Sequence, residues 1–347
     1  MNLSKRIAAF SSLGEILRDT LAGKQTDFTS RLAQLIENQQ QINPWFTPEN
    51  VRMAVSAVAR VLDTDNLNKW CASYPQLKEE SKPLKAGVIM AGNIPLAGFH
   101  DFIAVLITGN GIIAKTSAKD KDLIVLISDI LCKVNQEFSG RIEITDGAIS
   151  GFDAVIATGS DNSSRYFEYY FGMYPNIIRK NRNSIAFIDG SESDDELKAL
   201  GTDIFSYFGL GCRNVSKIYV PEGYDLKKMI SCWSSFSGII NHNKYANNYD
   251  YHKAVFLVNK EKFIDAGYLL LREHAGLSSP VAVLYYEFYR TPDKFRQQIQ
   301  YMTDKIQCIV GHDGVPFGKA QMPFLWDYAD GVDTIEFLLK KNSMGIL

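Results

Sequence analysis

The sequence lacks the features that mark several common classes of protein. Its five cysteines, at positions 71, 132, 212, 232 and 308, are odd in number, and no two lie at metal-ligand spacing. This argues against a disulfide scaffold and against a zinc site. No run reaches the roughly 20 apolar residues of a membrane helix, and the start shows neither the apolar core nor the cleavage site of a secretion signal. We expect no metal centre, no membrane span and a location in the reducing cytosol.

Strong charge and the familiar nucleotide motifs are also missing. The formal net charge is -2 and no basic stripe stands out, so nucleic acid is a poor candidate partner. The GxGxxG and GxxxxGK[ST] signatures are absent, which excludes the common dinucleotide and P-loop fingerprints. What is present is a chain of 347 residues with 46% hydrophobic content. That is enough to bury a large core, and more than one lobe is expected.

Residues 1–80 have the pattern of a helical segment. Thr47 followed by Pro48 is typical of a helix N-cap with proline at the first helical position. Apolar residues then recur at helical spacing as far as Leu62. We expect Trp45 and Trp70 to pack this helical layer rather than to bind a ligand.

From residue 85 onward, short apolar strands alternate with helices. In the first series, strands are predicted at 86–90, 111–115, 141–145 and 154–158, with helices at 95–107, 121–134 and 159–170. In the second series, strands are predicted at 184–188, 217–220, 281–285 and 306–310, with helices at 194–208 and 292–302. Such alternation predicts βαβ units and parallel sheets covered on both faces.

The order of these elements predicts an α/β fold of two lobes behind an N-terminal helical segment. The predicted boundaries are 1–84 for the helical segment, 85–184 for the first lobe and 185–324 for the second. The pattern leaves open whether the C-terminal tail, about 325–347, returns to the first lobe.

Cys212 is the most informative of the cysteines. It ends the run Gly209-Leu210-Gly211-Cys212 at a helix-to-strand junction, where glycine permits tight backbone geometry and close approach of a ligand. Arg213 and Asn214 follow it, and a reactive thiolate needs such a polar, partly open setting. The other four cysteines read as structural. Taken alone, the local pattern still favours a buried turn cysteine over a catalytic one.

Polar residues also follow the strands of the first lobe. Gly92-Asn93-Ile94-Pro95 comes after the first strand, at the end where open α/β sheets bind ligands. The Asn93 amide is suited to donating to an oxyanion, although a plain turn explains it equally well. Lys115-Thr116-Ser117-Ala118-Lys119 ends the second strand and suits a ribose or phosphate, with a solvated loop as the simpler alternative. Gly159-Ser160 begins a helix whose free N–H groups suit a pyrophosphate.

In this order the pieces resemble the aldehyde dehydrogenase superfamily. That superfamily has an asparagine–proline turn, a strand ending in lysine, a Gly-Ser helix start and a Gly-x-x-Cys nucleophile. The closer resemblance is to the LuxC-type fatty acyl-CoA reductases. It is carried by Phe46-Thr47-Pro48-Glu49-Asn50-Val51 and by the tail Asp327-Tyr328-Ala329-Asp330-Gly331-Val332-Asp333. The resemblance runs from about residue 45 to 340 and implies two Rossmann-like lobes, the first binding the cofactor and the second holding the nucleophile.

The resemblance also implies a role for each matching position. Cys212 would be the nucleophile, and Asn93 with the Cys212 N–H would form the oxyanion hole. Lys115 and Ser117 would contact the adenosine ribose, and Gly159-Ser160 the nicotinamide half of the cofactor. The substrate would be acyl-CoA or another acyl thioester. A homo-oligomer or an acyl-transferring partner enzyme is compatible with the resemblance.

Three departures from the superfamily pattern refine this picture. The Glu-Leu-Gly-Gly motif that carries a general base is replaced by residues 179–182, which contain no glutamate, so the acyl group is not meant for hydrolysis. NAD-preferring members have a glutamate three residues after the lysine. Here that place is Ala118, followed by Lys119, which favours the 2′-phosphate of NADPH. The Glu-x-Phe-Gly-Pro motif survives only as residues 276–280 without its glutamate, and Glu273 is a weak substitute.

Together these features predict reduction of a fatty acyl thioester to an aldehyde with NADPH, through a thioester intermediate on Cys212. The alternatives are a cysteine-dependent acyltransferase without a hydride step and a non-catalytic subunit of an acyl-reductase assembly. A group of aromatic residues after Ser160 suits either an acyl tunnel or the core, and the core is favoured. These residues are Phe167, Tyr169, Tyr170, Phe171 and Tyr174.

Overall fold

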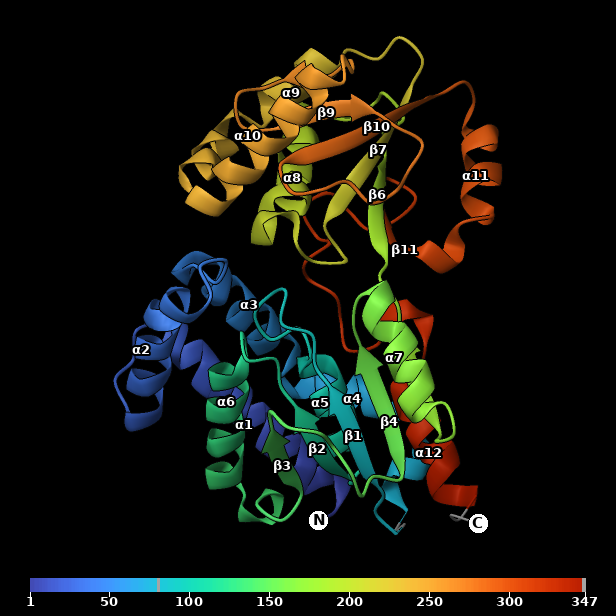
Figure 1. The fold of residues 1–347 in the computed structure, drawn as a ribbon. Coiled ribbons are helices and arrows are strands. Elements are labelled where there is room, and N and C mark those ends of the chain that lie inside the picture. Colours follow the sequence, from blue (N-terminus) through green and yellow to red (C-terminus); the bar gives the residue numbers. More distant parts are fainter. Residues whose placement is uncertain (80–81, 345–347) are drawn as a thin grey trace. The chain divides into compact units, whose positions relative to one another are not determined.

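The computed structural model describes residues 1–79 and 82–344 (Figure 1). The chain divides into two compact units. The first unit comprises Met1–Asn181 together with the C-terminal segment that begins at Pro323, and the second comprises Arg182–Met322. Within the described residues, no helix combines the length and the apolar character that crossing a membrane requires.

The first unit begins with helices, as the sequence predicts. These are α1 (Leu3–Leu21), α2 (Asp27–Ile42), α3 (Pro48–Val61) and α4 (Thr64–Ala72), followed by the 3-10 helix η1 (Pro75–Lys78). Thr47 caps α3 by accepting the Asn50 N–H, and Pro48 occupies the first helical position. α1 packs against α2, α3 and α4. Trp70 is buried in the core of this unit and Trp45 packs against it, which confirms their predicted structural role.

The sheet of the first unit has five parallel strands in the order β3-β2-β1-β4-β5. The strands are β1 (Lys85–Ile89), β2 (Gly111–Lys115), β3 (Ile142–Thr145), β4 (Ala154–Thr158) and β5 (Asn176–Arg179). The connecting elements are α5 (Phe99–Ile107), α6 (Lys121–Val134), η2 (Gln136–Phe138) and α7 (Asp161–Phe171). Because β1 lies between β2 and β4, the strand order reverses at β1. The carboxyl ends of these three strands therefore form the kind of switch point where α/β sheets bind ligands.

The C-terminal segment completes the first unit. It contains η6 (Ala329–Gly331) and α12 (Thr334–Met344), and α12 packs against α5. Leu325, Ile335 and Leu338 are buried in the core that the N-terminal helices and the sheet share.

The second unit is built on a six-stranded sheet in the order β11-β6-β7-β10-β9-β8. Its strands are β6 (Asn183–Phe187), β7 (Val215–Pro221), β8 (Ile264–Asp265), β9 (Leu270–Glu273), β10 (Val283–Tyr289) and β11 (Ile306–Val310). All neighbouring strands run parallel except β8 and β9, which are antiparallel. Alternate residues of a strand face opposite sides of a sheet. Accordingly, Ala186 and Ile218 belong to one hydrophobic cluster, and Ile185 and Tyr219 to another.

Helices accompany this second sheet. They are α8 (Asp194–Phe205), η3 (Ser206–Gly209), α9 (Leu226–Cys232), η4 (Ser234–Asn241), α10 (Asn243–Val258), α11 (Pro292–Gln300) and η5 (Thr303–Lys305). The predicted α/β class with mainly parallel sheets is confirmed. The helix predicted to start at residue 95 is wrong at its beginning, because α5 starts at Phe99. The preceding Leu96 has a φ of 58°, which is outside the helical region.

Candidate active site

Cys212 lies in the turn that joins η3 to β7, in the second unit. Its side chain is exposed, whereas Cys71 is buried and the other three cysteines are half-buried. Burial raises the pKa of the Cys71 thiol to about 11, which keeps it protonated and unreactive at neutral pH. Cys212 is therefore the cysteine that a reagent in solution reaches most easily. The alternative of a buried turn cysteine is wrong.

The chain approaches Cys212 through an unusual backbone conformation. Tyr207, Phe208 and Gly209 have φ values of 51°, 58° and 75° in succession. Glycine adopts such values freely, but each non-glycine residue there costs about 1–3 kcal/mol and persists only when its surroundings hold it. The sequence pointed to the glycine and contained no sign of the two strained aromatic residues before it.

Two side chains hold the Cys212 turn in place. The buried Asn214 amide donates to the carbonyl oxygens of Asp203 (3.0 Å) and Ser206 (2.8 Å), and its side-chain oxygen accepts the Gly211 N–H (2.8 Å). These hydrogen bonds satisfy carbonyl oxygens at the C-terminal end of α8, where a helix leaves its last carbonyl groups without intrahelical partners. On the other side, the Ser184 hydroxyl donates to the Cys212 carbonyl oxygen at 2.9 Å. The turn is therefore anchored both to α8 and to β6.

A third anchor runs through residues 318–320. Arg213 Nε donates to the Ala320 carbonyl oxygen at 2.5 Å. The Asp203 carboxylate, on α8, accepts the N–H groups of Gly318 (2.6 Å) and Ala320 (2.9 Å). Asp203 is fully buried, and burial raises its pKa to about 6. Arg213, the residue after Cys212, is thus connected to α8 through this short segment, which we call the 318–320 clamp.

In the first unit, Asn93 is exposed in the bend that follows β1. Its neighbour Gly92 lies so close to the next loop that an added Cβ would be 2.4 Å from the Cβ and Oγ of Ser117. No side chain fits there, so glycine is required for the two loops to touch. The loops carrying Asn93 and Ser117 follow adjacent strands, β1 and β2, and meet at this point.

Lys115 is the last residue of β2, and its ammonium group is held by backbone oxygens. Lys115 Nζ donates to the carbonyl oxygens of Asp146 (3.0 Å) and Gly147 (2.6 Å). The Ser117 hydroxyl accepts the Lys119 N–H at 3.3 Å, and the Lys119 side chain is exposed. A cation and a hydroxyl therefore lie together beyond the carboxyl end of β2.

Gly159 and Ser160 follow β4, the other neighbour of β1. Ser160 is the N-cap of α7 and accepts the Ser163 N–H at 3.3 Å, so the predicted helix start is confirmed. A Cβ on Gly159 would be 2.8 Å from the Phe167 ring and from Ser163, so only glycine lets α7 begin this close to the strand. All the residues predicted for the cofactor thus lie at the carboxyl ends of β2 and β4, the two strands that flank β1 in the sheet of the first unit.

Residues 179–182, where the resemblance predicts that a general-base motif is missing, offer no carboxylate. Arg179 is buried; its guanidinium forms an ion pair with Asp101 and donates to Thr334 Oγ1 at 3.0 Å. Lys180 is exposed and pairs with Glu168. The arginine has a structural role within the first unit.

Comparison with known proteins identifies the family. The family model described as acyl-CoA reductase (LuxC) matches residues 63–236. The chain belongs to the LuxC acyl-CoA reductase family. The match spans every predicted site residue from Asn93 to Cys212. No curated protein sequence matches the chain significantly.

Solved structures show the fold of this LuxC family member. The aldehyde dehydrogenase of Mycobacterium tuberculosis complexed with NAD+ is similar at a TM-score of 0.63 and 13% identity, over 89% of this chain and 73% of that one. An NAD-dependent aldehyde dehydrogenase from Sinorhizobium meliloti has a TM-score of 0.61 and 10% identity, over 89% and 70% of the two chains. The predicted family, the aldehyde dehydrogenase-like fold and the assignment as an oxidoreductase are confirmed.

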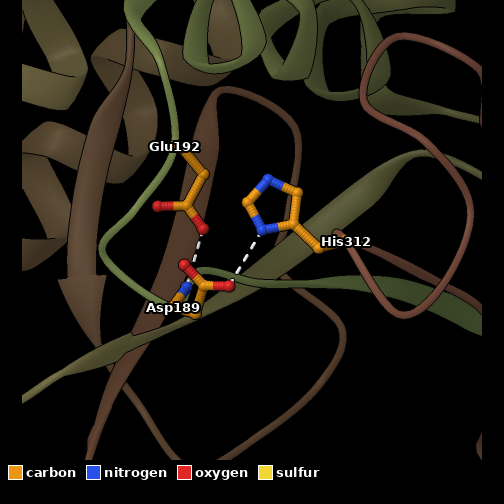
Figure 2. A group of neighbouring side chains, drawn as sticks. All are labelled: Asp189, Glu192 and His312. Carbon is orange, nitrogen blue, oxygen red and sulfur yellow. Dashed lines mark hydrogen bonds and ion pairs between the residues drawn. The ribbon is translucent and has the colours of Figure 1, made fainter.

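The LuxC family member also has a polar cluster that the sequence did not reveal (Figure 2). Asp189 and His312 follow β6 and β11, which are neighbouring strands. His312 Nδ1 lies 2.8 Å from Asp189 Oδ2, and Nε2 lies 3.1 Å from Glu196 Oε1. Glu192 accepts the N–H groups of Asp189 (2.7 Å) and Gly190 (3.1 Å). The cluster joins the ends of the two strands.

The charges explain why this cluster holds together. The carboxylates of Asp189 and Glu196 accept hydrogen bonds from the His312 ring, which raises the pKa of His312. Although burial acts in the opposite direction, hydrogen bonds from Ser191 and His312 lower the pKa of Asp189 to about 2. Potential ligand atoms of Asp189, Glu192 and His312 lie within 4.8 Å of one another. Carboxylate oxygens and imidazole nitrogens are atoms that can bind a metal cation. Because both ring nitrogens of His312 already face carboxylates, we interpret the cluster as an ion-pair network.

The prediction that the aromatic residues around α7 belong to the core is wrong for three of them. Tyr169 is 81% exposed, Tyr170 65% and Tyr174 46%. Only Phe167 and Phe171 are half-buried. Of this group, the two phenylalanines are half-buried and the three tyrosines face solvent.

Proposed function

We propose that this protein reduces a fatty acyl thioester to the aldehyde with NADPH, through an acyl-enzyme on Cys212. The observation that carries the proposal is that Cys212 is an exposed residue, held in a turn with three separate anchors, in a member of an acyl-CoA reductase family. A cysteine that is both exposed and held in a well-anchored turn keeps its sulfur in a fixed position relative to a bound substrate, which favours reaction.

The proposed chemistry begins with the Cys212 thiolate. Its sulfur forms a bond to the thioester carbonyl carbon, and the Asn93 amide and the Cys212 N–H donate to the resulting oxyanion. The bond to the carrier sulfur then breaks, the carrier thiolate takes a proton, and the acyl group stays on Cys212. When bound, NADPH supplies the hydride that reduces this acyl group. Release of the aldehyde breaks the carbon–sulfur bond and returns the Cys212 thiolate.

The residues beyond β2 and β4 are proposed to hold the cofactor. Lys115 and Ser117 are assigned to the adenosine ribose, Lys119 to the 2′-phosphate and Gly159-Ser160 to the nicotinamide half. One observation supports a polar ligand here: within the part of the chain that the structure describes, the buried Thr116 hydroxyl has no hydrogen-bond partner. The structures of aldehyde dehydrogenases with NAD+ from Mycobacterium tuberculosis and Bacillus cereus support a nicotinamide cofactor for this fold. The proposal that the cofactor is NADPH rather than NADH rests on the exposed Lys119, which is assigned to the 2′-phosphate.

Two further parts of the proposal concern water and partners. Residues 179–182 contain no aspartate or glutamate, so this stretch does not supply a carboxylate base that would activate water against the acyl-enzyme. The substrate is proposed to be acyl-CoA or another acyl thioester. A homo-oligomer and an acyl-transferring partner enzyme stay predictions, and the exposed tyrosines of α7 offer a surface for either.

The proposal is tested by acyl labelling. The protein is incubated with a radiolabelled long-chain acyl-CoA, and NADPH is then added. Cys212→Ala should acquire no label and form no aldehyde, because the nucleophile is gone. The half-buried Cys232, at the end of α9, is the control, and Cys232→Ala should behave like the native protein.

The other outcomes separate the alternatives. Aldehyde formation by Cys212→Ala would show the proposed mechanism to be wrong. Acyl labelling of native protein that does not bind NADPH would select the acyltransferase. A native Cys212 that resists both alkylation and acyl transfer would select the non-catalytic subunit.

A further inference from the structure

Asp120 occupies a helix N-cap without serving as one. It directly precedes α6, yet its side chain makes no capping hydrogen bond. Instead, Asp120 Oδ2 accepts the backbone N–H of Leu96 at 2.8 Å, across 24 residues of sequence. The side chain is 4% exposed. The carboxylate does not bind the nearby N–H groups of α6, and its hydrogen bond goes to a loop that is distant in the sequence. We infer that its role lies in that loop.

The loop that Asp120 contacts is strained. Leu96 is buried and has a φ of 58°, a conformation that costs a leucine about 1–3 kcal/mol unless neighbouring contacts impose it. The N–H that Asp120 accepts belongs to this same residue, so the hydrogen bond acts directly on the strained backbone. Asn93 lies three residues earlier in the same loop.

The two loops touch at a second point. Gly92 approaches Ser117 so closely that only glycine fits. We call residues 91–98 the Asn93 loop and residues 116–120 the cofactor loop. Gly92 against Ser117 fixes the start of the Asn93 loop, and Leu96 against Asp120 fixes its far end, with Asn93 between the two contacts.

The environment of Asp120 makes this contact costly to alter. The second carboxylate oxygen, Oδ1, is buried and has no hydrogen-bond partner among the described residues. Burial also raises the pKa of Asp120 well above its usual value. A buried carboxyl group that makes only one hydrogen bond destabilises the fold. We therefore expect Asp120 to have a functional role that offsets this cost in stability.

We propose that Asp120 is a positioning residue, which holds Asn93 in the orientation needed to donate to the oxyanion. It acts through the Leu96 N–H and does not itself touch the substrate. This inference rests on the proposed function, because it takes the donor role of Asn93 from there. It adds that the cofactor loop sets the geometry of the oxyanion donor.

A double-mutant cycle tests the proposal, with kcat and KM for acyl-CoA measured at saturating NADPH. Asn93→Ala should lower kcat about 100-fold, as removal of one oxyanion donor does. Asp120→Ala should lower kcat roughly 10-fold with little change in KM, because the donor is displaced while substrate binding is kept. In the double variant, the loss should equal that of Asn93→Ala alone, since a donor that is absent cannot be mispositioned.

Two further variants separate positioning from folding. Asp120→Asn should restore kcat to within about 3-fold of native, because its amide oxygen can still accept the Leu96 N–H. Asp122→Ala is the matched control: Asp122 is exposed in the first turn of the same helix, and kcat should not change. If Asp120→Ala does not fold, Asp120→Val takes its place, since valine keeps the volume and removes the acceptor.

The outcomes distinguish the two levels of the proposal. If the losses of Asn93→Ala and Asp120→Ala multiply in the double variant, Asp120 acts independently of Asn93 and the positioning role is wrong. A native kcat in Asp120→Ala or Asp120→Val would also overturn it. A native kcat in Asn93→Ala would instead overturn the oxyanion role within the proposed function, and the positioning role with it.

Discussion

Single side chains decide the cofactor preference in the proposed function, and Lys119 is the clearest case. It is exposed beyond β2, so its charge can be reversed without disturbing a core. We predict that Lys119→Glu lowers the ratio of kcat/KM for NADPH over NADH by about 10-fold or more, because a carboxylate repels the 2′-phosphate that the ammonium attracts. Steady-state kinetics with both cofactors checks this. Lys198→Glu makes the same charge change at an exposed position on α8 and should leave the ratio unaltered. An unchanged ratio in Lys119→Glu would remove the argument for NADPH.

Residues whose chemistry is visible in a local motif could be predicted, and residues that act through distant contacts could not. Cys212 was singled out by its glycines, and it is the exposed cysteine. Asp203 contacts Gly318 across 115 residues, and Asp120 contacts Leu96 across 24. An aspartate that accepts a backbone N–H so far away has no local pattern. The fold must be known before such a residue can be recognised.

At the scale of elements, buried parallel strands were predictable because each is a short continuous apolar run. β2, β4 and β11 have the predicted bounds. α10 and β9 were missed. α10 buries only Tyr245, Tyr249 and Phe256, which is too little apolar periodicity to indicate a helix. β5 was missed because its four residues end in Arg179, whose charge is buried only through the ion pair with Asp101.

The 318–320 clamp is joined to α8 through the carboxylate of Asp203. Burial raises the pKa of Asp203 to about 6 in the folded protein, above the ordinary value of about 3.9 in the unfolded chain. The folded state therefore holds the proton more tightly. The stability from this group is complete below about pH 3, is lost as the pH rises through about 4 to 6 and is constant above about pH 7. The difference between the pKa in the folded protein and that in the unfolded chain corresponds to ~3 kcal/mol.

We predict that the free energy of unfolding of the native protein falls relative to that of Asp203→Asn between pH 4 and 7, by about 2 kcal/mol. The difference should be flat from pH 7 to 8. Urea unfolding across this pH range measures it. Asp195→Asn, at an exposed position in the first turn of α8, should show no such trend. A constant difference between native protein and Asp203→Asn would contradict the raised pKa.

At the scale of the whole molecule, the chain leaves the first unit at Asn181 and returns to it at Pro323. Buried and partly buried contacts hold the returning segment. The Trp70 indole donates to the Tyr328 hydroxyl at 2.7 Å, and His100 Nε2 lies 2.8 Å from the Leu325 carbonyl oxygen. Arg179 joins α12 through Thr334 while it pairs with Asp101 on α5. The stability of the first unit therefore depends on both ends of the sequence.

Removing the Arg179 charge should affect the two units unequally. Breaking a buried ion pair by removing one partner leaves an uncompensated charge, here Asp101, and costs about 3–5 kcal/mol. We predict that Arg179→Met speeds hydrogen–deuterium exchange of the most protected amides in residues 1–79, 82–181 and 323–344. Exchange within Arg182–Met322 should change little, because the altered contacts all lie in the first unit. Lys180→Met removes an exposed charge from the adjacent position and should leave both units unchanged. If Arg179→Met loosens the second unit as much as the first, the two units unfold as one cooperative body, and the returning segment stabilises the whole chain.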